Sequence, residues 1–582
     1  MRLSLLLSAF ALAAGAKRPN ILFILTDDQD LHMQSVQHMP HVQSLIVDKG
    51  TTYSQHYCTV ALCCPSRATL WTGRAAHNHN VTNVAPPYGG YPKVIEQGVN
   101  DDNLFLWMQD VGYNTYYVGK LWNFHSVDNY DSPFARGFNG SDFLLDPFTY
   151  QYYNAKITHN GEPPVSYQGQ YSTDIISQKA NDWLDEALGQ DEPFFLTVSP
   201  IAPHSNWVIE PENNRSYLLA PRVADRHKHL FKDYRIPRDD SFNKVITGGA
   251  SWIGGLEELN DTVLEYNDHY QRQRLRALQS VDEMVDELVS RLEEAGELDN
   301  TYIFYTTDNG YHISQHGMHP GKECGLDTDI HIPFFIRGPG ISQGEQIDVV
   351  TSHTDVSSTI LKIAGIEKQL DGDSIPLHAE DSNETPRHEH IAIEYWGPGV
   401  PEGFYGGRTD LDREAGQWQN YYLNNTYKGL RLVSQDYSLY YSVWCTNQTE
   451  LYDLKSDPYQ TRNILAERLP SYYSIASRPL EQVIPRLEAL IMVLKTCKDK
   501  SCTQPWEVLH PDGTVRSLGD AMSSTFDSFY AAQPRMWFKG CPLGYFADWE
   551  NQTPVASFSI ERQQEGLIKQ GFDWADHWQW FT

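Results

Sequence analysis

Three kinds of feature are scarce or missing in this sequence, and each shortage excludes a structural class. Eight cysteines in 582 residues are too few for a disulfide scaffold. No run of lysines and arginines occurs, which argues against a protein that binds nucleic acid through a basic stripe. Beyond the first 16 residues, no apolar run approaches the roughly 20 residues that a membrane-spanning helix needs. Of the structural classes considered, a large globular protein with a hydrophobic core fits the sequence.

Negative charge, by contrast, is abundant. The chain has 75 Asp and Glu residues against 45 Lys and Arg, a formal net charge of −30. Such a surface repels long polyanions, so we expect no nucleic-acid partner, and we expect any anionic substrate to be small. The hydrophobic content of 40% is ample for a large core and for more than one domain.

The N-terminus has the pattern of a secretory signal. Arg2 precedes an apolar run from Leu5 to Ala14, and small residues follow, so residues 1–16 are predicted to be removed as a signal peptide. The run is too short to span a bilayer, and we expect a secreted protein with no stable membrane association. Sequons for N-glycosylation fit this route and lie at Asn80, Asn139, Asn214, Asn260, Asn383, Asn424, Asn447 and Asn551.

The chemistry concentrates in the stretch from Cys63 to Arg74. Pro65 suits the first turn of a helix, which puts Cys63 just upstream of a helix start. The free amides and the dipole of that start favour an anion, and Arg67 adds a planar cation. The alternative is that Cys58, Cys63 and Cys64 are disulfide-bonded or buried thiols.

The pattern Cys-x-Pro-Ser-Arg followed by Leu-x-Thr-Gly-Arg resembles the signature of the type I sulfatases. This resemblance implies that Cys63 is converted after synthesis to formylglycine, an aldehyde that is hydrated in the resting enzyme. A formylglycine-generating enzyme is then a partner during maturation. It also implies an α/β, alkaline-phosphatase-like fold: a large mixed, mostly parallel sheet flanked by helices, with a smaller C-terminal domain that contains an antiparallel sheet.

Two apolar runs end in acidic residues. Residues 21–25 lead into Asp27 and Asp28, and residues 301–307 lead into Asp308 and Asn309. An amphipathic stretch from Leu278 to Leu292 precedes the second run, and this order predicts parallel strands whose acidic ends meet at one sheet edge. The alternatives are a solvated strand end for the first run and an Asn-Gly hairpin turn for the second.

Three carboxylates and an amide carbonyl suit a hard cation, Ca²⁺ rather than Mg²⁺. By resemblance, Asp27, Asp28, Asp308 and Asn309 match the family's calcium ligands, with the converted Cys63 as a further ligand.

Other predicted strands end in cations. Residues 113–118 lead into Lys120, and residues 193–198 lead toward His204. By resemblance, Lys120 and Lys322 match the two sulfate-binding lysines, Arg67 helps to hold the sulfate oxygens, and His204 protonates or polarises the leaving oxygen.

One position departs from the family pattern. Many sulfatases carry a histidine two residues after the first lysine, but Trp122 stands there in this chain. The replacement is left open among Asn123, His125, His312 and His316. Trp122 and the His77-Asn78-His79-Asn80 stretch make the chain look closest to the glucosamine-6-sulfatase branch and related fungal arylsulfatases. For His77 and His79 we favour an exposed loop.

The predicted domains are residues 17–380, catalytic, and 381–582, a C-terminal α+β domain that completes the fold. Residues 332–336 and 356–364 read as a further strand and helix of the first domain, and a polar stretch at 371–386 marks the boundary. Beyond it, residues 427–433, 437–444 and 450–454 indicate antiparallel strands. Residues 397–416 are expected to form a loop rather than a lid. The last hundred or so residues match nothing recognisable.

The cysteines suggest a local bridge between Cys497 and Cys502, and a second between Cys445 and Cys541. If Cys63 is modified, seven cysteines remain, so at least one thiol stays unpaired or pairs outside the chain.

The expected activity is hydrolysis of sulfate esters, foremost aryl sulfates. The alternatives are a sugar 6-sulfatase similar to N-acetylglucosamine-6-sulfatase, a phosphonate or phosphodiester hydrolase of the same superfamily, and a secreted binding protein in which Cys63 is never modified.

Overall fold

The computed structural model describes residues 17–210, 215–378, 387–406, 421–467 and 473–559. The predicted signal peptide, the boundary at residue 380 and residues 407–416 of the predicted loop lie outside these ranges. No helix among the described residues is both long enough and apolar enough to cross a membrane.

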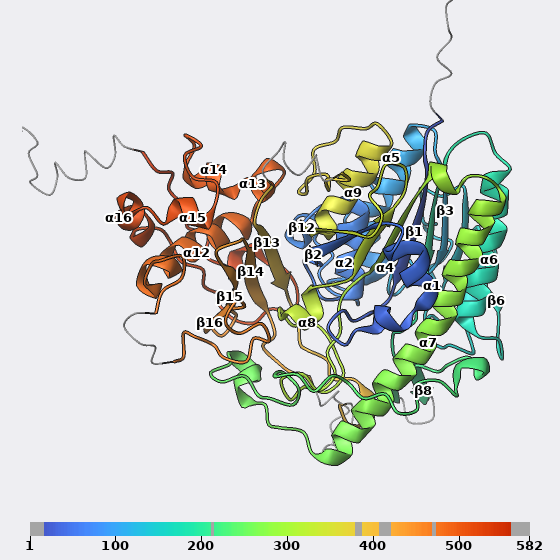
Figure 1. Ribbon diagram of the computed structural model, residues 1–582, viewed down its shortest axis with the longest axis horizontal. Helices are drawn as coiled ribbons and strands as arrows, with labels where there is room; N and C mark the ends of the chain where they lie inside the picture. Colours follow the sequence, from blue (N-terminus) through green and yellow to red (C-terminus); the bar gives the residue numbers. More distant parts are fainter. Residues whose placement is uncertain (1–16, 211–214, 379–386, 407–420, 468–472, 560–582) are drawn as a thin grey trace, which may run out of the picture.

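A sheet of ten strands forms the larger part of the molecule (Figure 1). In spatial order its strands are β12 (Glu345–Ser352), β2 (Thr51–Tyr57), β11 (Phe334–Arg337), β10 (Thr301–Thr307), β1 (Asn20–Thr26), β7 (Phe194–Ser199), β3 (Asn114–Gly119), β4 (Gly140–Leu144), β5 (Lys156–His159) and β6 (Val165–Ser166). The central strands from β10 to β4 are parallel, whereas β11, β5 and β6 pair antiparallel with their neighbours. The expected large mixed sheet is confirmed.

Helices cover both faces of this sheet. The long helix α7 (Asp261–Glu294) and α6 (Ser172–Leu188) pack on one face, and their buried side chains share a core with Leu22, Ile24 and Leu196 of the strands. The other face carries α2 (Cys63–Thr72), α4 (Gly90–Glu96), α5 (Leu104–Asp110) and α9 (His353–Ile363). Because both faces are covered, β1 and β10 are buried along their whole length, and the middle of each strand is apolar or aromatic.

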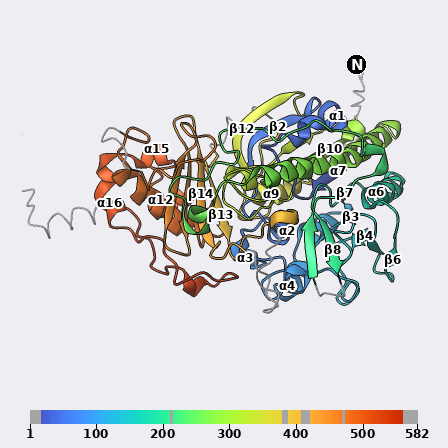
Figure 2. The same ribbon diagram turned by 90° about the horizontal axis from the view of Figure 1, so that it is seen from below.

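A second sheet lies beside the first (Figures 1 and 2). Its four antiparallel strands are β13 (His390–Tyr395), β14 (Tyr427–Val433), β15 (Ser438–Trp444) and β16 (Thr449–Asp453). The helix α12 (Leu480–Leu494) and the short α13 (Lys500–Thr503), α14 (Pro505–Leu509), α15 (Leu518–Ala521) and α16 (Asp527–Ala531) cover its far side. The expected antiparallel C-terminal sheet is confirmed, while the division at residue 380 stays a prediction.

Both suggested disulfides form, Cys445 with Cys541 and Cys497 with Cys502. Besides Cys63, three buried cysteines stay free: Cys58, Cys64 and Cys324. Their thiols lie within the core and stabilise it as small apolar groups.

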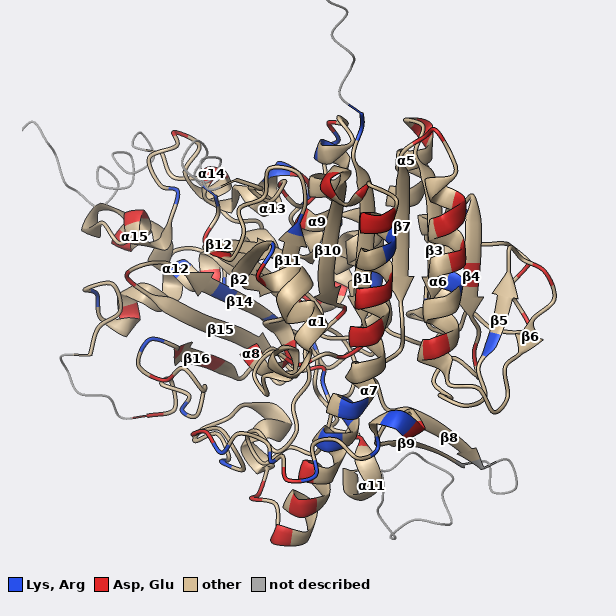
Figure 3. Cartoon of the chain, turned by 45° about the vertical axis from the view of Figure 1, so that its right-hand side comes forward, with Lys and Arg blue, Asp and Glu red and all other residues tan. Residues whose placement is uncertain are grey.

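Acidic residues recur along the outer surfaces of α6 and α7 (Figure 3). Several of them are paired, as in the contacts of Arg226 with Asp174 and Glu283, so part of the chain's negative charge is neutralised locally.

Candidate active site

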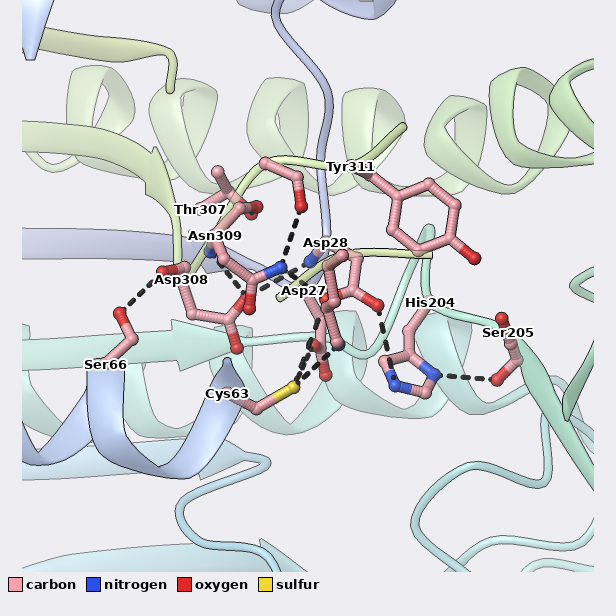
Figure 4. Close-up of polar contacts among 12 residues, drawn as sticks. Asp27, Asp28, Cys63, Ser66, His204, Ser205, Thr307, Asp308, Asn309 and Tyr311 are labelled. Carbon is pink, nitrogen blue, oxygen red and sulfur yellow. Dashed lines mark hydrogen bonds and ion pairs between the residues drawn. The ribbon is translucent and has the colours of Figure 1, made fainter. Parts of the chain in front are cut away.

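Cys63 is the first residue of α2, so the helix begins at the cysteine rather than just after it. Leu62 before it is extended, and Pro65 occupies the first turn, where its missing N–H leaves no partner unmet. The Cys63 side chain is buried and faces the carboxyl ends of β1 and β10 (Figure 4).

These two strands end side by side, as the sequence predicts. They pair in parallel up to Thr26 and Thr307, so Asp27 and Asp308 emerge at the same sheet edge. Successive strand residues point to opposite faces, yet both Asp27 and Asp28 reach the site. Asp28 has a left-handed φ of 65°, which turns its carboxylate back toward Asp27. Such a conformation is unfavourable for a residue other than glycine, and the surrounding contacts hold it in place.

The three carboxylates surround the Cys63 sulfur. Sγ lies 3.5 Å from Oδ1 of Asp27 and 3.9 Å from Oδ1 of Asp28. Asp308 accepts hydrogen bonds at Oδ1 from the backbone amides of Asp28 (3.1 Å) and Asn309 (3.0 Å). The side-chain amide of Asn309 donates to Oδ1 of Asp28 over 2.8 Å. The structure therefore brings Cys63, Asp27, Asp28, Asp308 and Asn309 together.

Three cations balance the three carboxylates. Arg67 donates from Nε to Oδ2 of Asp308 over 2.9 Å, and Lys120 donates to Oδ2 of Asp27 over 2.6 Å. Lys322 donates to Oδ1 of Asp28, and its Nζ lies 3.0 Å from the Cys63 sulfur. The predicted sulfate-binding residues thus converge on one buried ion cluster.

The charges in the cluster shift one another's titration. Burial and the neighbouring Asp308 raise the pKa of Asp27. Burial also opposes ionisation of Asp308, but Arg67 and the two lysines prevail and hold its pKa well below the usual range. Burial raises the pKa of the Cys63 thiol well above its ordinary value. An unmodified Cys63 therefore stays a protonated thiol and is a poor nucleophile.

His204 stands on the opposite side of the carboxylates from α2 (Figure 4). Its Nδ1 donates to the backbone oxygen of Ser205 over 2.8 Å, and its Nε2 lies 3.5 Å from Oδ2 of Asp28. The ring of Tyr150 stacks on the imidazole with 4.1 Å between the ring centres. The backbone bond fixes Nδ1 as the donor and leaves Nε2 directed toward the site.

The donor set fits a metal ion. One ligand atom each from Asp27, Asp28, Cys63 and His204 lies within 4.8 Å of the others. Oδ2 of Asp28 and Oδ1 of Asn309 are buried and have no hydrogen-bond partner. Unpaired buried oxygens are costly, and a hard cation would satisfy both of them.

Of the four candidates for the missing histidine, Asn123 bonds Tyr150, the residue that stacks on His204. Its Nδ2 donates to the Tyr150 hydroxyl over 2.7 Å, and Tyr150 in turn packs on His204. His312 is bonded to Asp329 over 2.8 Å, whereas His125 packs between Tyr91 and Phe143. Burial and nearby His312 lower the pKa of the remaining candidate, His316, to about 3, so its ring stays neutral.

The expectation of an exposed loop at His77 and His79 is wrong. Both are buried in the short helix α3 (Ala76–His79). His77 Nδ1 lies 2.9 Å from Oε2 of Glu394, and its Nε2 lies 2.8 Å from the backbone oxygen of Cys497. Lys428 bonds the same Glu394 oxygen over 2.6 Å. His77 therefore ties the segment after α2 to the C-terminal sheet.

The sequence analysis missed the groups around His204. Tyr150 follows no recognisable strand end, and Ser205, Tyr270, Tyr311 and Glu402 come from four separate parts of the chain. Ser205 and Tyr311 are direct neighbours of predicted site segments, and this adjacency is the only signal that could have indicated them.

The family model described as Sulfatase matches residues 19–366, more than half of the chain. The chain belongs to the sulfatase family. An arylsulfatase of Volvox carteri is 37% identical over 559 residues, which cover 92% of this chain and 83% of the relative. The N-acetylglucosamine-6-sulfatase of Homo sapiens is 30% identical, and the match covers 91% of each chain. This sulfatase is accordingly a sulfuric ester hydrolase.

Solved structures share the fold at lower identity. One is a protein in complex with its substrate D-glucosamine-2-N,6-O-disulfate, with a TM-score of 0.57, 22% identity, and coverage of 77% of this chain and 94% of that one. Another is the phosphonate monoester hydrolase of Agrobacterium radiobacter, with a TM-score of 0.54, 19% identity, and coverage of 78% and 92%. These likenesses concern the fold alone.

Proposed function

We propose that this sulfatase cleaves sulfate esters with the side chain at position 63 as the nucleophile, after oxidation of Cys63 to formylglycine. The observation that carries the proposal is the convergence on Cys63 of three carboxylates and three cations from distant parts of the chain. The raised pKa of the buried thiol disfavours the unmodified cysteine itself as the nucleophile. The hydrated aldehyde supplies two hydroxyls on one carbon, one to attack sulfur and one whose deprotonation lets sulfate depart.

We further propose that Asp27, Asp28, Asp308 and Asn309 hold Ca²⁺ together with position 63. The three carboxylates and the amide oxygen of this set suit a hard cation, and two of the oxygens, Oδ2 of Asp28 and Oδ1 of Asn309, are buried without a hydrogen-bond partner. The carboxylates and cations of the cluster roughly cancel, so a bound dication would supply the positive charge that attracts an anionic ester in a strongly acidic protein and favours ionisation of the attacking hydroxyl.

The three cations orient the sulfate group. Arg67 is held rigidly, with Nη1 donating to Ser199 Oγ over 2.9 Å while Nε bonds Asp308. The Lys322 ammonium lies 3.0 Å from the Cys63 sulfur. The Lys120 ammonium bonds Asp27, whose Oδ1 lies 3.5 Å from the same sulfur. Their positive charge stabilises the equatorial oxygens as negative charge develops.

We assign His204 as the acid that gives a proton to the leaving oxygen. Its Nδ1 is committed to the Ser205 carbonyl, so Nε2 is the nitrogen available to donate. Asn123 takes the place of the absent family histidine: it is only 8% exposed, and its Oδ1 is a buried acceptor without a partner. We assign that oxygen to a hydroxyl of the hydrated aldehyde or of the substrate.

Aryl sulfates are the first expected substrates, since phenols leave readily and ask little of His204. Carbohydrate sulfates are the second candidate, supported by the human N-acetylglucosamine-6-sulfatase, which matches along nearly the whole chain. A phosphonate or phosphodiester hydrolase stays the third, and a non-catalytic secreted protein the fourth if Cys63 is unmodified. Export through the secretory pathway, N-glycosylation and maturation by a formylglycine-generating enzyme complete the proposal.

Mass spectrometry of the peptide that ends at Arg67 tests the nucleophile. We expect an aldehyde or its hydrate at position 63, and an intact thiol in all of the protein would contradict the proposal. A panel of 4-nitrophenyl sulfate, sugar 6-sulfates, and phosphate and phosphonate esters then tests the reaction. We expect sulfate esters to be cleaved fastest, and a preference for phosphorus esters would instead favour the third candidate.

A further inference from the structure

A fourth carboxylate, Glu402, lies at the edge of this site and comes from beyond the residues that the family model matches. It is 3% exposed and directly precedes α11 (Gly403–Gly406). Its backbone amide donates to the carbonyl of Pro320 over 2.6 Å, so it is attached to the loop that bears Lys322. Two residues earlier, the amide of Val400 donates to the side chain of Glu323 on the same loop.

Three hydroxyls hold one oxygen of this carboxylate. Oε2 accepts hydrogen bonds from Tyr311 (2.7 Å), from Tyr270 (3.3 Å) and from Ser205. Within the described part of the chain, every hydrogen bond to this carboxylate arrives at Oε2. The other oxygen, Oε1, therefore keeps its capacity to accept.

Glu402 is held near His204 and Lys322 by residues adjacent to them in the sequence. Ser205 and Tyr311 lie on the His204 side of the cluster, away from Cys63 (Figure 4). Glu402 also bonds the Pro320 carbonyl, two residues before Lys322, so its contacts tie it to the His204 segment and to the Lys322 loop.

In a displacement at sulfur, the departing alcohol lies opposite the attacking group. Attack comes from position 63, so the alcohol lies toward His204, the assigned acid. Glu402 stands on that side. Because Oε1 keeps its capacity to accept, a leaving group that donates a hydrogen bond gains a contact with Glu402 that an aromatic leaving group without a donor cannot make.

We propose that Glu402 is a specificity-determining residue whose Oε1 accepts a hydrogen bond from the ring of a carbohydrate sulfate. Resting on the function proposed above, this inference names the substrate class: sulfate esters of sugars, with a hydroxyl or an ammonium group near the esterified carbon. Phenyl sulfates are then cleaved for their good leaving group and gain nothing from Glu402.

The test compares Glu402→Gln with the wild-type enzyme on 4-nitrophenyl sulfate, glucose 6-sulfate and glucosamine 6-sulfate. We expect kcat/KM for at least one sugar sulfate to fall roughly tenfold or more, mostly through KM, because a site built to bond a donor loses that bond. For the aryl sulfate we expect a change within about threefold, since that substrate makes no such bond. A larger loss on the glucosamine ester indicates an ammonium, and an equal loss on both sugar esters indicates a hydroxyl.

A matched control is Tyr270→Phe, which removes one donor to Oε2 and keeps the carboxylate. It should lower kcat/KM by a similar, small factor on all three substrates. Equal losses on aryl and sugar sulfates in Glu402→Gln would overturn the inference, because they indicate a purely structural role. An unchanged kcat/KM for sugar sulfates in that variant would overturn it too.

A measurement on wild-type enzyme keeps the test independent of folding. Glucose or glucosamine should inhibit turnover of 4-nitrophenyl sulfate competitively and more strongly than phenol does, and the opposite order would count against the inference. Turnover of aryl sulfate with none of sugar sulfates would refute the inference and leave the proposed function standing. Turnover of neither ester would refute the proposed function itself, and the inference with it.

Discussion

Replacing Lys322 with methionine should tighten calcium binding while abolishing efficient catalysis. The Lys322 ammonium bonds Asp28 and lies 3.0 Å from the Cys63 sulfur, so it would compete with a cation for the same oxygen. A dication and an ammonium about 5 Å apart, at an effective dielectric constant near 20, repel by roughly 7 kcal/mol. If about a fifth of this repulsion persists after the Lys322 side chain turns toward Glu402, removing the ammonium strengthens calcium binding by ~1.4 kcal/mol. This corresponds to a tenfold lower Kd for calcium.

Isothermal titration of chelator-stripped protein with CaCl₂ measures this change without any turnover. Lys322→Arg is the matched control, because it keeps the charge and should bind calcium about as the wild type does. The rise of the unfolding temperature with calcium should also be larger in Lys322→Met, since the buried Asp28 has lost its partner. Equal or weaker calcium binding by Lys322→Met would refute the idea that the lysine and the ion share one place.

Three further outcomes are expected. Cys63→Ser should lose multiple turnover by at least about 10³-fold, with sulfate retained on the protein by mass spectrometry, and rapid turnover by this variant would contradict the proposed nucleophile. Tyr150→Leu should lower kcat about three- to tenfold by freeing the His204 ring, whereas Tyr150→Phe should keep most of the activity. Glu394→Gln should lower the free energy of unfolding by about 3 kcal/mol at pH 7, because His77 and Lys428 lose the carboxylate that they share. Despite its burial, His77 and Lys428 hold the pKa of Glu394 well below its usual range, so the stabilisation is complete above the unfolded value and is lost as pH falls through the folded one. Thermal unfolding should therefore show the deficit of this variant shrinking below about pH 4, and a deficit that is constant with pH would contradict this assignment.

The sequence could indicate the centre of the site because each group there follows a local pattern. Asp27 and Asp308 follow apolar runs whose order with an amphipathic stretch favours parallel strands, and parallel strands bring their carboxyl ends to one edge. Cys63 and Arg67 are fixed by one helix start. Each of these patterns extends over only a few residues, so it predicts the position of the side chain without knowledge of long-range contacts.

The border of the site could not be predicted in this way. Tyr150 belongs to a loop, and it becomes relevant only because the fold stacks it on His204. His77 was expected at the surface because histidines near a turn usually are, but its partner Glu394 lies more than three hundred residues away. Contacts of this range depend on how the two sheets pack, which no local spacing encodes.

The ion cluster explains why an acidic enzyme can work on an anion. Each carboxylate that the proposed metal would need is paired with a cation of the chain, Asp308 with Arg67, Asp27 with Lys120, and Asp28 with Lys322. A bound ion would therefore add charge to a site that is already balanced, and the ester anion would meet a net positive pocket. The same balance lets the chain bury these residues before any ion arrives, because a buried charge is tolerated only when it is paired. Folding and anion binding thus depend on the same six side chains, and a substitution that unpairs one of them should disturb both.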